Sequence, residues 1–211
     1  MKRNLLVALL VAGLSVPALS QYDNGPTNGT VDAWTINSGF TVSDTFFIGA
    51  QGEQTFLMFA AWLFPGDVVE SVDVSITSSE FGGTTYFDGV VSLVGSGCVT
   101  NQFGFNVCNE IGSFGPVLLN AGTYWLNLSN AVVPTGDPVY WDENSGPSAA
   151  SQNSVGTIPS ESFTIGGCFG SNGKNSPGCG PPPTAPEPGS LWLFGSGIVG
   201  PFGINALRRL L

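Results

Sequence analysis

The sequence predicts an all-β protein whose main domain is an antiparallel β-sandwich with a jelly-roll-like arrangement. Short runs in which apolar and polar residues alternate recur along the chain, which is the pattern of half-buried strands. Turn-forming residues separate these runs, and the chain contains 30 glycines and 15 prolines. No window combines a sustained helical period with capping residues. Many short strands between such turns are typical of sandwiches and jelly rolls.

Individual strands can be placed from these patterns. Three segments alternate apolar and polar residues and predict strands with one buried face, at 40–48, 72–76 and 124–129. The segment 56–64 is apolar throughout and ends at Pro65-Gly66-Asp67, which predicts a central strand buried on both faces. Further strand candidates are the segments 84–94, 104–108, 139–141 and 161–165.

Residues 1–20 have the three parts of a cleavable signal peptide. Lys2 and Arg3 supply positive charge, residues 5–16 are mostly apolar, and Ala18-Leu19-Ser20 offers small residues at both cleavage positions. The apolar stretch is shorter than the roughly 20 residues that a membrane-spanning helix needs. We therefore expect signal peptidase and the general secretory machinery to handle the chain, and the mature protein to begin near Gln21.

The C-terminus combines Pro186-Glu187-Pro188, an uncharged segment 189–207 and the pair Arg208-Arg209. The uncharged segment is long enough to span a membrane as a helix, and the arginines would hold its far end in the cytoplasm. Its glycines, together with Pro201 and Asn205, favour a segment that is recognised and then removed. An ordinary, permanent C-terminal anchor is the alternative.

Taken together, Pro186-Glu187-Pro188, the glycine-rich apolar segment and Arg208-Arg209 resemble the PEP-CTERM sorting tail of exported bacterial proteins, here over residues 186–211. The resemblance implies processing by an exosortase, a membrane-embedded cysteine peptidase that cleaves near the Pro-Glu-Pro motif. It also implies transient anchoring in the membrane and an association with exopolysaccharide. The final location would then be the cell surface or the extracellular matrix.

The body of the chain also resembles a domain of PEP-CTERM proteins that brings no established activity with it. The segments that carry this second resemblance are 22–26, 61–67, 122–126, 138–144 and 159–163. The resemblance supports the predicted sandwich and implies nothing about chemistry.

The charge of the chain excludes several classes of partner and reaction. Residues 21–173 contain no lysine, arginine or histidine, whereas fourteen acidic residues precede Ala185. Binding to nucleic acid or anionic lipid depends on basic side chains, so we expect no nucleic-acid partner. The absence of histidine removes the usual base of serine and cysteine nucleophiles, and the absence of lysine from the domain removes Schiff-base and Ser-Lys chemistry.

Residues 166–185 form a linker by composition, because Gly, Ser, Asn and Pro dominate there. The four cysteines of an exported chain indicate disulfides. Four cysteines allow three connectivities, and we favour pairing between neighbours, Cys98 with Cys108 and Cys168 with Cys179. The second pair lies inside the linker, where it would close a small loop. Because the linker begins at residue 166, we expect the folded domain to span residues 21–165.

The most concentrated polar and aromatic cluster is Tyr140-Trp141-Asp142-Glu143-Asn144. Trp and Tyr can stack on sugar rings while Asp and Asn bond sugar hydroxyls, which makes this segment a candidate glycan site. The favoured alternative places Tyr140 or Trp141 in the core and lets the polar residues shape the next turn.

Asp142 and Glu143 also form a carboxylate pair. Adjacent strand residues point to opposite faces, however, so a glycoside hydrolase would need a further carboxylate.

Loop residues with hard oxygen donors are candidate ligands for a structural calcium ion: Asp23, Asp137 and Asp142, with Asn24, Glu143 and Asn144. They lack the spacing of an EF-hand, and no other cofactor is expected.

We expect a non-catalytic surface or matrix protein, structural or adhesive in an exopolysaccharide layer. A carbohydrate-binding module that uses residues 140–144 is the alternative, and a glycoside hydrolase is a more distant one.

Overall fold

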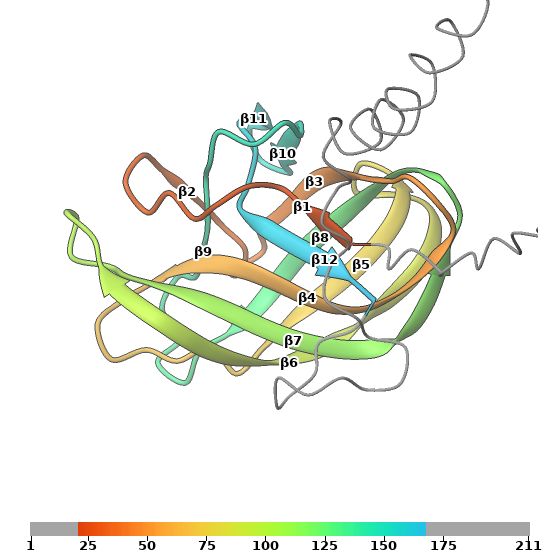
Figure 1. Ribbon diagram of the computed structural model, residues 1–211. Helices are drawn as coiled ribbons and strands as arrows, with labels where there is room; N and C mark the ends of the chain where they lie inside the picture. The colour runs from red at the N-terminus through yellow and green to blue at the C-terminus, as the bar shows by residue number, and fades with distance from the viewer. Residues whose placement is uncertain (1–20, 168–211) are drawn as a thin grey trace, which may run out of the picture.

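The computed structural model describes residues 21–167, and this part of the chain contains twelve strands and no helix (Figure 1). The all-β, antiparallel class predicted from the sequence is confirmed, because the strands pair antiparallel. In chain order the strands are β1 (Gln21–Asp23), β2 (Ala33–Thr35), β3 (Thr41–Ile48), β4 (Gly52–Leu63), β5 (Ser71–Ser79), β6 (Gly82–Thr100), β7 (Asn106–Leu119), β8 (Gly122–Val132), β9 (Tyr140–Asp142), β10 (Ala150–Gln152), β11 (Gly156–Ile158) and β12 (Phe163–Gly166).

The strands form one continuous sheet in the order β1-β12-β4-β7-β6-β5-β8-β3-β10-β11, with β9 beside β4 and β2 beside β9. β6 joins the two halves of the sheet, because its first part pairs with β5 and its second part with β7. The sheet curls until strands of opposite halves meet: the rings of Tyr22 in β1 and Phe46 in β3 are 6.1 Å apart. The result is a curled half-barrel (Figure 1), so the predicted sandwich with its jelly-roll arrangement is not confirmed.

One large apolar cluster fills the interior of the half-barrel. Val72, Val74 and Ile76 in β5 are fully buried, as are Leu126 and Leu128 in β8. The alternation seen in the sequence therefore identifies the buried faces of these strands correctly. Each such side chain removed from water contributes roughly 1.5–3 kcal/mol to folding, which makes this cluster the main stabilising element.

β4 is buried on both faces, as its continuous apolar run predicts. Phe59 and Leu63 face the interior of the half-barrel. Ala60 and Trp62 face outward, where they form a second, smaller cluster with Val107 of β7. The outer face of β4 is thus covered by other parts of the chain, and this cover forms the surface described below.

β6 and β7 form a long hairpin that the sequence predicts only in part, because the expected strands 84–94 and 104–108 extend to Gly82–Thr100 and Asn106–Leu119. Gly112 lies inside β7 although glycine is typical of turns. A Cβ on Gly112 would overlap a methyl group of Val91. This glycine therefore permits a close approach between strands and does not end one.

The predicted Cys98–Cys108 disulfide is confirmed. It joins β6 to β7 near the end of the hairpin, where the two Cα atoms are 4.1 Å apart. The bond closes the loop that contains the hairpin tip, residues 101–105, and so restrains the segment that carries Phe103 and Phe105.

Several predicted features lie outside the described residues. These are the signal peptide at 1–20, the Cys168–Cys179 pair, most of the linker at 166–185 and the membrane-spanning sorting helix within 186–211. Within residues 21–167, no helix is long and apolar enough to cross a membrane. The proposed boundaries between signal peptide, domain, linker and tail stay predictions.

Candidate functional site

The segment Tyr140–Asn144 lies mainly inside the protein. Trp141 in β9 is fully buried, packs edge-on against Phe59 and Phe163, and donates a 2.9 Å hydrogen bond from Nε1 to the carbonyl of Ser162. Tyr140 is half-buried. The Trp141 ring therefore anchors the core and offers no face to a sugar. This position is the one given by the alternative that the sequence favours, in which Tyr140 or Trp141 belongs to the core.

Asp142 connects the N-terminal loop, residues 24–32, to the outer face of β4. Its Oδ2 accepts a hydrogen bond from the amide of Asn28 (2.7 Å), and its Oδ1 accepts bonds from the amide of Gly29 (2.7 Å) and from Trp62 Nε1 (2.6 Å). Burial raises the pKa of this carboxyl, and the three hydrogen bonds oppose that rise. Asp142 thus holds the N-terminal loop against the indole of Trp62.

The N-terminal loop reaches the β6–β7 hairpin through two further contacts. Gln102 donates from Nε2 to the carbonyl of Thr30 (3.0 Å), and Thr27 donates from its hydroxyl to Oδ1 of Asn109 (3.2 Å). Gly29 has a φ of +64°, and a Cβ there would lie 3.3 Å from Val107. Glycine at this position lets the loop turn and lie close over β7.

An aromatic cluster covers the outward-facing indole of Trp62. The ring of Phe103 stacks on Trp62 at 5.7 Å and 24°, and the ring of Phe105 lies 5.9 Å from the same indole. Phe105 also contacts Phe64 at 5.0 Å and Tyr140 at 5.6 Å. Phe103 is 55% exposed whereas Trp62 is 5% exposed. Phe103 therefore presents one ring face to Trp62 and the rest of its surface to solvent.

A hollow of about 420 Å³ lies between the N-terminal loop and the hairpin, and we call it the hairpin hollow. Most of its lining side chains carry hydroxyl or carboxamide groups, two are valines, and none of these described residues carries a charge. The lining comprises Thr27, Asn28, Gly29, Thr30, Gly97, Val99, Thr100, Asn101, Gln102, Val107 and Asn109.

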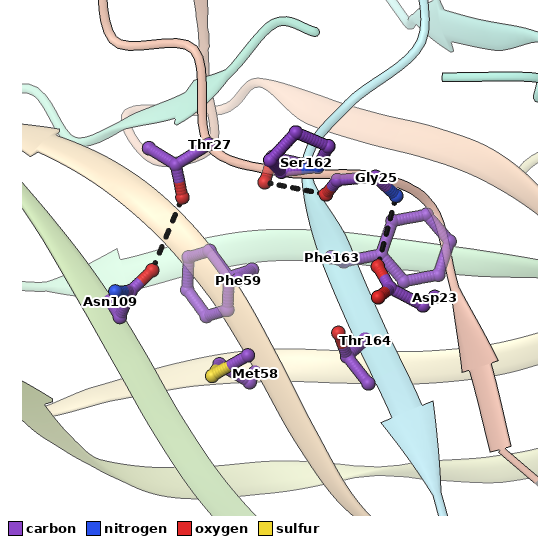
Figure 2. Close-up of a pocket in the computed structure, with 10 residues that line it drawn as sticks. Asp23, Gly25, Thr27, Met58, Phe59, Asn109, Ser162, Phe163 and Thr164 are labelled. Carbon is purple, nitrogen blue, oxygen red and sulfur yellow. Dashed lines mark hydrogen bonds between the residues drawn. The ribbon is translucent and has the colours of Figure 1, made fainter. Parts of the chain in front are cut away.

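A second hollow of about 370 Å³, here the strand hollow, adjoins the first one (Figure 2). Thr27 and Asn109 line both hollows, so the Thr27–Asn109 hydrogen bond in Figure 2 marks the boundary between them. Met58 and Thr164 lie on the other side of that bond. A third hollow, of about 480 Å³, lies between residues 25–28 and 144–147.

Behind these surfaces lies a buried polar centre formed by Asn24, Asp44, Ser148, Ser160 and Glu161. Nδ2 of Asn24 lies within 2.6–3.1 Å of one oxygen from each of the other four residues. The amide of Glu161 donates to Asp44 Oδ2 at 2.8 Å. Burial raises the pKa of Asp44 to about 6. The segments 22–26 and 159–163, noted in the sequence analysis, thus meet inside the protein.

Comparison with known protein families decides what the C-terminus is. The family model of the PEP-CTERM protein-sorting motif matches residues 184–209. The chain therefore carries a PEP-CTERM sorting motif at residues 184–209. The motif is the signature of exosortase substrates and indicates a protein that is exported and sorted at its C-terminus. A search of curated proteins found no match to the chain.

The three aspartates among the calcium candidates have separate places in the fold. Asp23 accepts a hydrogen bond from the amide of Gly25 (2.9 Å), and both oxygens of Asp142 are bonded as described above. Asp137 precedes β9, where its carbonyl accepts from Asn37 (2.8 Å). Within residues 21–167, no group of three or more His, Cys, Asp or Glu side chains is placed to hold a metal ion.

The carboxylates of Asp142 and Glu143 lie on opposite faces, as adjacent strand residues must. Asp142 bonds Trp62 on the outer side, whereas Glu143 accepts from Trp34 Nε1 at 3.2 Å. The residue opposite Glu143 on the neighbouring segment is Glu161, which is fully buried. Burial, and then the charge of Asp44, raise the pKa of Glu161 well above its usual range. The two facing glutamates are therefore not both open to a substrate.

Sequence reasoning missed the residues that form the hairpin hollow and its aromatic rim. Thr27, Asn109 and Gln102 belong to no motif, and the segment around Phe103 was expected to begin a short strand. The one signal that points to them is the pair Cys98 and Cys108, because a disulfide over ten residues predicts a hairpin with its tip near Phe103.

Proposed function

We propose that this protein is a non-catalytic component of the bacterial cell surface or extracellular matrix, structural or adhesive within an exopolysaccharide layer. The PEP-CTERM motif at residues 184–209 is the observation that carries the proposal. A folded β domain precedes the tail, so processing at Pro186-Glu187-Pro188 would release or transfer that domain outside the inner membrane.

The chemistry of the domain supports a role without catalysis. Residues 21–167 contain no histidine, lysine or arginine, so carboxylates and the four tyrosines are the side chains left to act as general acid or base. Asp44, Glu110, Asp142 and Glu161 are buried, and Asp142 is already bonded to three donors. A pair of carboxylates that flanks a glycosidic bond has to touch the substrate on both sides. The burial of these four carboxylates supports a role without catalysis.

The sorting step is tested by mass spectrometry of the protein recovered from a host that contains the cognate exosortase. We expect a mature N-terminus near Gln21 and a C-terminus near Pro186-Glu187-Pro188. The matched control is Glu187→Ala, which changes the motif and leaves residues 21–167 untouched. Recovery of wild-type protein that still carries Arg208-Arg209 contradicts exosortase processing and supports a permanent anchor.

The location is tested separately, by fractionating those cells into periplasm, membrane, surface polysaccharide and medium. The proposal expects the processed wild-type protein in the surface polysaccharide or the medium. It expects the Glu187→Ala variant to accumulate with the membrane. Processed protein that stays in the periplasm contradicts a surface or matrix role.

A further inference from the structure

The exposed ring of Phe103 and the hairpin hollow lie at the same end of the β6–β7 hairpin. Phe103 directly follows Asn101 and Gln102, which line the hollow. It stacks on Trp62, whose cross-strand neighbour Val107 also lines the hollow. We propose that this surface binds a neutral polysaccharide, with Phe103 stacking on a sugar ring and the hollow bonding its hydroxyl groups. The inference deepens the proposed matrix role and depends on it.

The Phe103 ring is held in place before any ligand arrives. The amide of Phe103 donates to Asn101 Oδ1 at 3.0 Å, and the same oxygen accepts from the amide of Phe105 at 3.0 Å. Below the ring, Trp62 is fixed by its bond to Asp142. An aromatic ring that is already ordered loses little conformational entropy when a ligand packs against it.

The polar groups of the hollow suit hydroxyl-rich ligands. Gln102 uses Nε2 to bond Thr30, and Asn109 uses Oδ1 to accept from Thr27. The other carboxamide atoms, Oε1 of Gln102 and Nδ2 of Asn109, have no hydrogen-bond partner among residues 21–167. One is an acceptor and the other a donor, so together they match a sugar hydroxyl, which both donates and accepts.

The charge of the domain selects a neutral glycan over an anionic one. Residues 21–167 carry fourteen acidic and no basic side chains, so an anionic polysaccharide would be repelled at long range and would find no cation at the surface. The lining of the hollow adds no charge of either sign. A neutral chain avoids this repulsion, and its hydroxyl groups match the carboxamides and hydroxyls present.

The adjoining strand hollow provides room for a chain longer than one sugar. It shares Thr27 and Asn109 with the hairpin hollow and presents Met58, Thr164 and Ser162 beyond them (Figure 2). The third hollow, beside residues 144–147, is lined by no aromatic side chain. The lining of the hairpin hollow likewise contains no aromatic side chain, but the exposed ring of Phe103 directly follows its lining residue Gln102.

The test is native gel electrophoresis of the processed, secreted protein through gels that contain dextran, pullulan or alginate. We expect the two neutral glucans to retard the wild type and anionic alginate not to. Phe103→Ala should weaken the apparent affinity on the order of tenfold, the effect of losing one well-packed aromatic contact. The matched control is Phe47→Ala, since Phe47 is 58% exposed on β3, away from the hollow, and should bind like the wild type.

Two outcomes overturn the proposal: no retardation of the wild type by either neutral glucan, or equal retardation of Phe103→Ala and wild type. Sedimentation velocity of the same variants is measured as well. If Phe103→Ala changes the sedimentation coefficient and leaves the retardation by glucans unchanged, the surface is a protein–protein contact and the glycan assignment is wrong. Thr27→Val provides a second variant, because it removes a hydroxyl from the wall of both hollows at nearly constant shape. Fractionation of the same variants separates the two claims: a wild type that reaches the matrix but binds no glucan contradicts the site and leaves the location intact.

Discussion

The inner and outer faces near β9 differ in what their residues do. On the inner side, Trp141 and Glu161 are fully buried, and they belong to the segments that look most functional in the sequence. On the outer side, the hairpin hollow is lined by threonines, amides, glycines and two valines, and one exposed phenylalanine follows it in the chain. The aromatic and acidic residues that stand out in the sequence are thus buried and support the fold. The accessible surface is formed by residues that belong to no sequence motif. Asp142 connects the two, because it lies in the conspicuous segment and holds both Trp62 and the N-terminal loop.

Substitutions on the two faces should affect different quantities, the free energy of unfolding for the inner face and ligand binding for the outer face. Substitutions of the inner residues should change the free energy of unfolding, because they remove buried contacts. Substitutions at the hairpin tip should change binding and leave that free energy nearly unchanged, since exposed side chains contribute little to it.

Replacement of Trp141 should have the largest effect. Trp141→Ala removes a fully buried indole from contact with Phe59 and Phe163, so we expect the free energy of unfolding to fall by roughly 3–5 kcal/mol. Urea unfolding followed by circular dichroism measures the change. Phe103→Ala, the exposed counterpart, should shift it by less than about 1 kcal/mol. Similar losses for both variants would remove the distinction between the two faces.

Replacement of Asp142 should come next. Asp142→Ala leaves the amides of Asn28 and Gly29 and the indole N–H of Trp62 without their acceptor, so we expect a loss of roughly 3 kcal/mol. The same urea experiment applies, with Asp88→Ala as the control because Asp88 is exposed. The variant should also loosen the loop over the hollow and so weaken glucan binding. A stable variant with unchanged binding contradicts the supporting role of Asp142.

Removal of the disulfide should have a smaller effect on stability. We expect the double variant Cys98→Ser, Cys108→Ser to lose roughly 2–3 kcal/mol, as expected for a bond that closes a loop of about ten residues. Differential scanning calorimetry measures the loss. Because the bond restrains the tip that carries Phe103, limited proteolysis should cut the variant first within residues 101–105. First cleavage elsewhere within the domain contradicts this restraint.

The pH dependence of stability should reveal the buried carboxyl of Glu110. Its pKa is raised by burial from an ordinary value of 4.5 to about 7. A carboxyl with a raised pKa in the folded state supports folding fully below the unfolded pKa, and this contribution is lost as the pH rises through the folded pKa. The wild type should therefore be more stable at pH 5 than at pH 8.

Glu110→Gln isolates that contribution, because the amide does not ionise. After discounting for partial contact with solvent, we expect the loss of stability between pH 5 and pH 8 to shrink by roughly 1–2 kcal/mol in this variant. Thermal melts at the two pH values measure it, and Glu53→Gln, at an exposed position of β4, is the control. An unchanged pH dependence in Glu110→Gln contradicts a buried, ionisable Glu110.

The strands and the sorting motif were predictable because each is written in a local pattern. Alternation located the buried faces at Val72–Ile76 and Leu126–Leu128, and the apolar run at 56–64 located the doubly buried β4. The order of Pro186-Glu187-Pro188, apolar segment and arginine pair located the tail. The spacing of Cys98 and Cys108 located one disulfide.

The rest depends on contacts that are distant in sequence. A sandwich was expected because the sequence does not show that β6 runs on from one half of the sheet to the other. The roles of residues 140–144 were open because burial of Trp141 depends on Phe59 and Phe163, far away along the chain. The hairpin hollow joins residues 27–30 to residues 97–109, and no local pattern predicts that contact.

The most direct test of the division between support and surface is hydrogen–deuterium exchange of the full-length protein with and without dextran. The account predicts that dextran slows exchange in residues 97–105 and 27–30, which surround the hairpin hollow. It predicts no change at residues 140–147. Slowed exchange confined to residues 140–147 would contradict the account and return the binding site to the segment around Trp141.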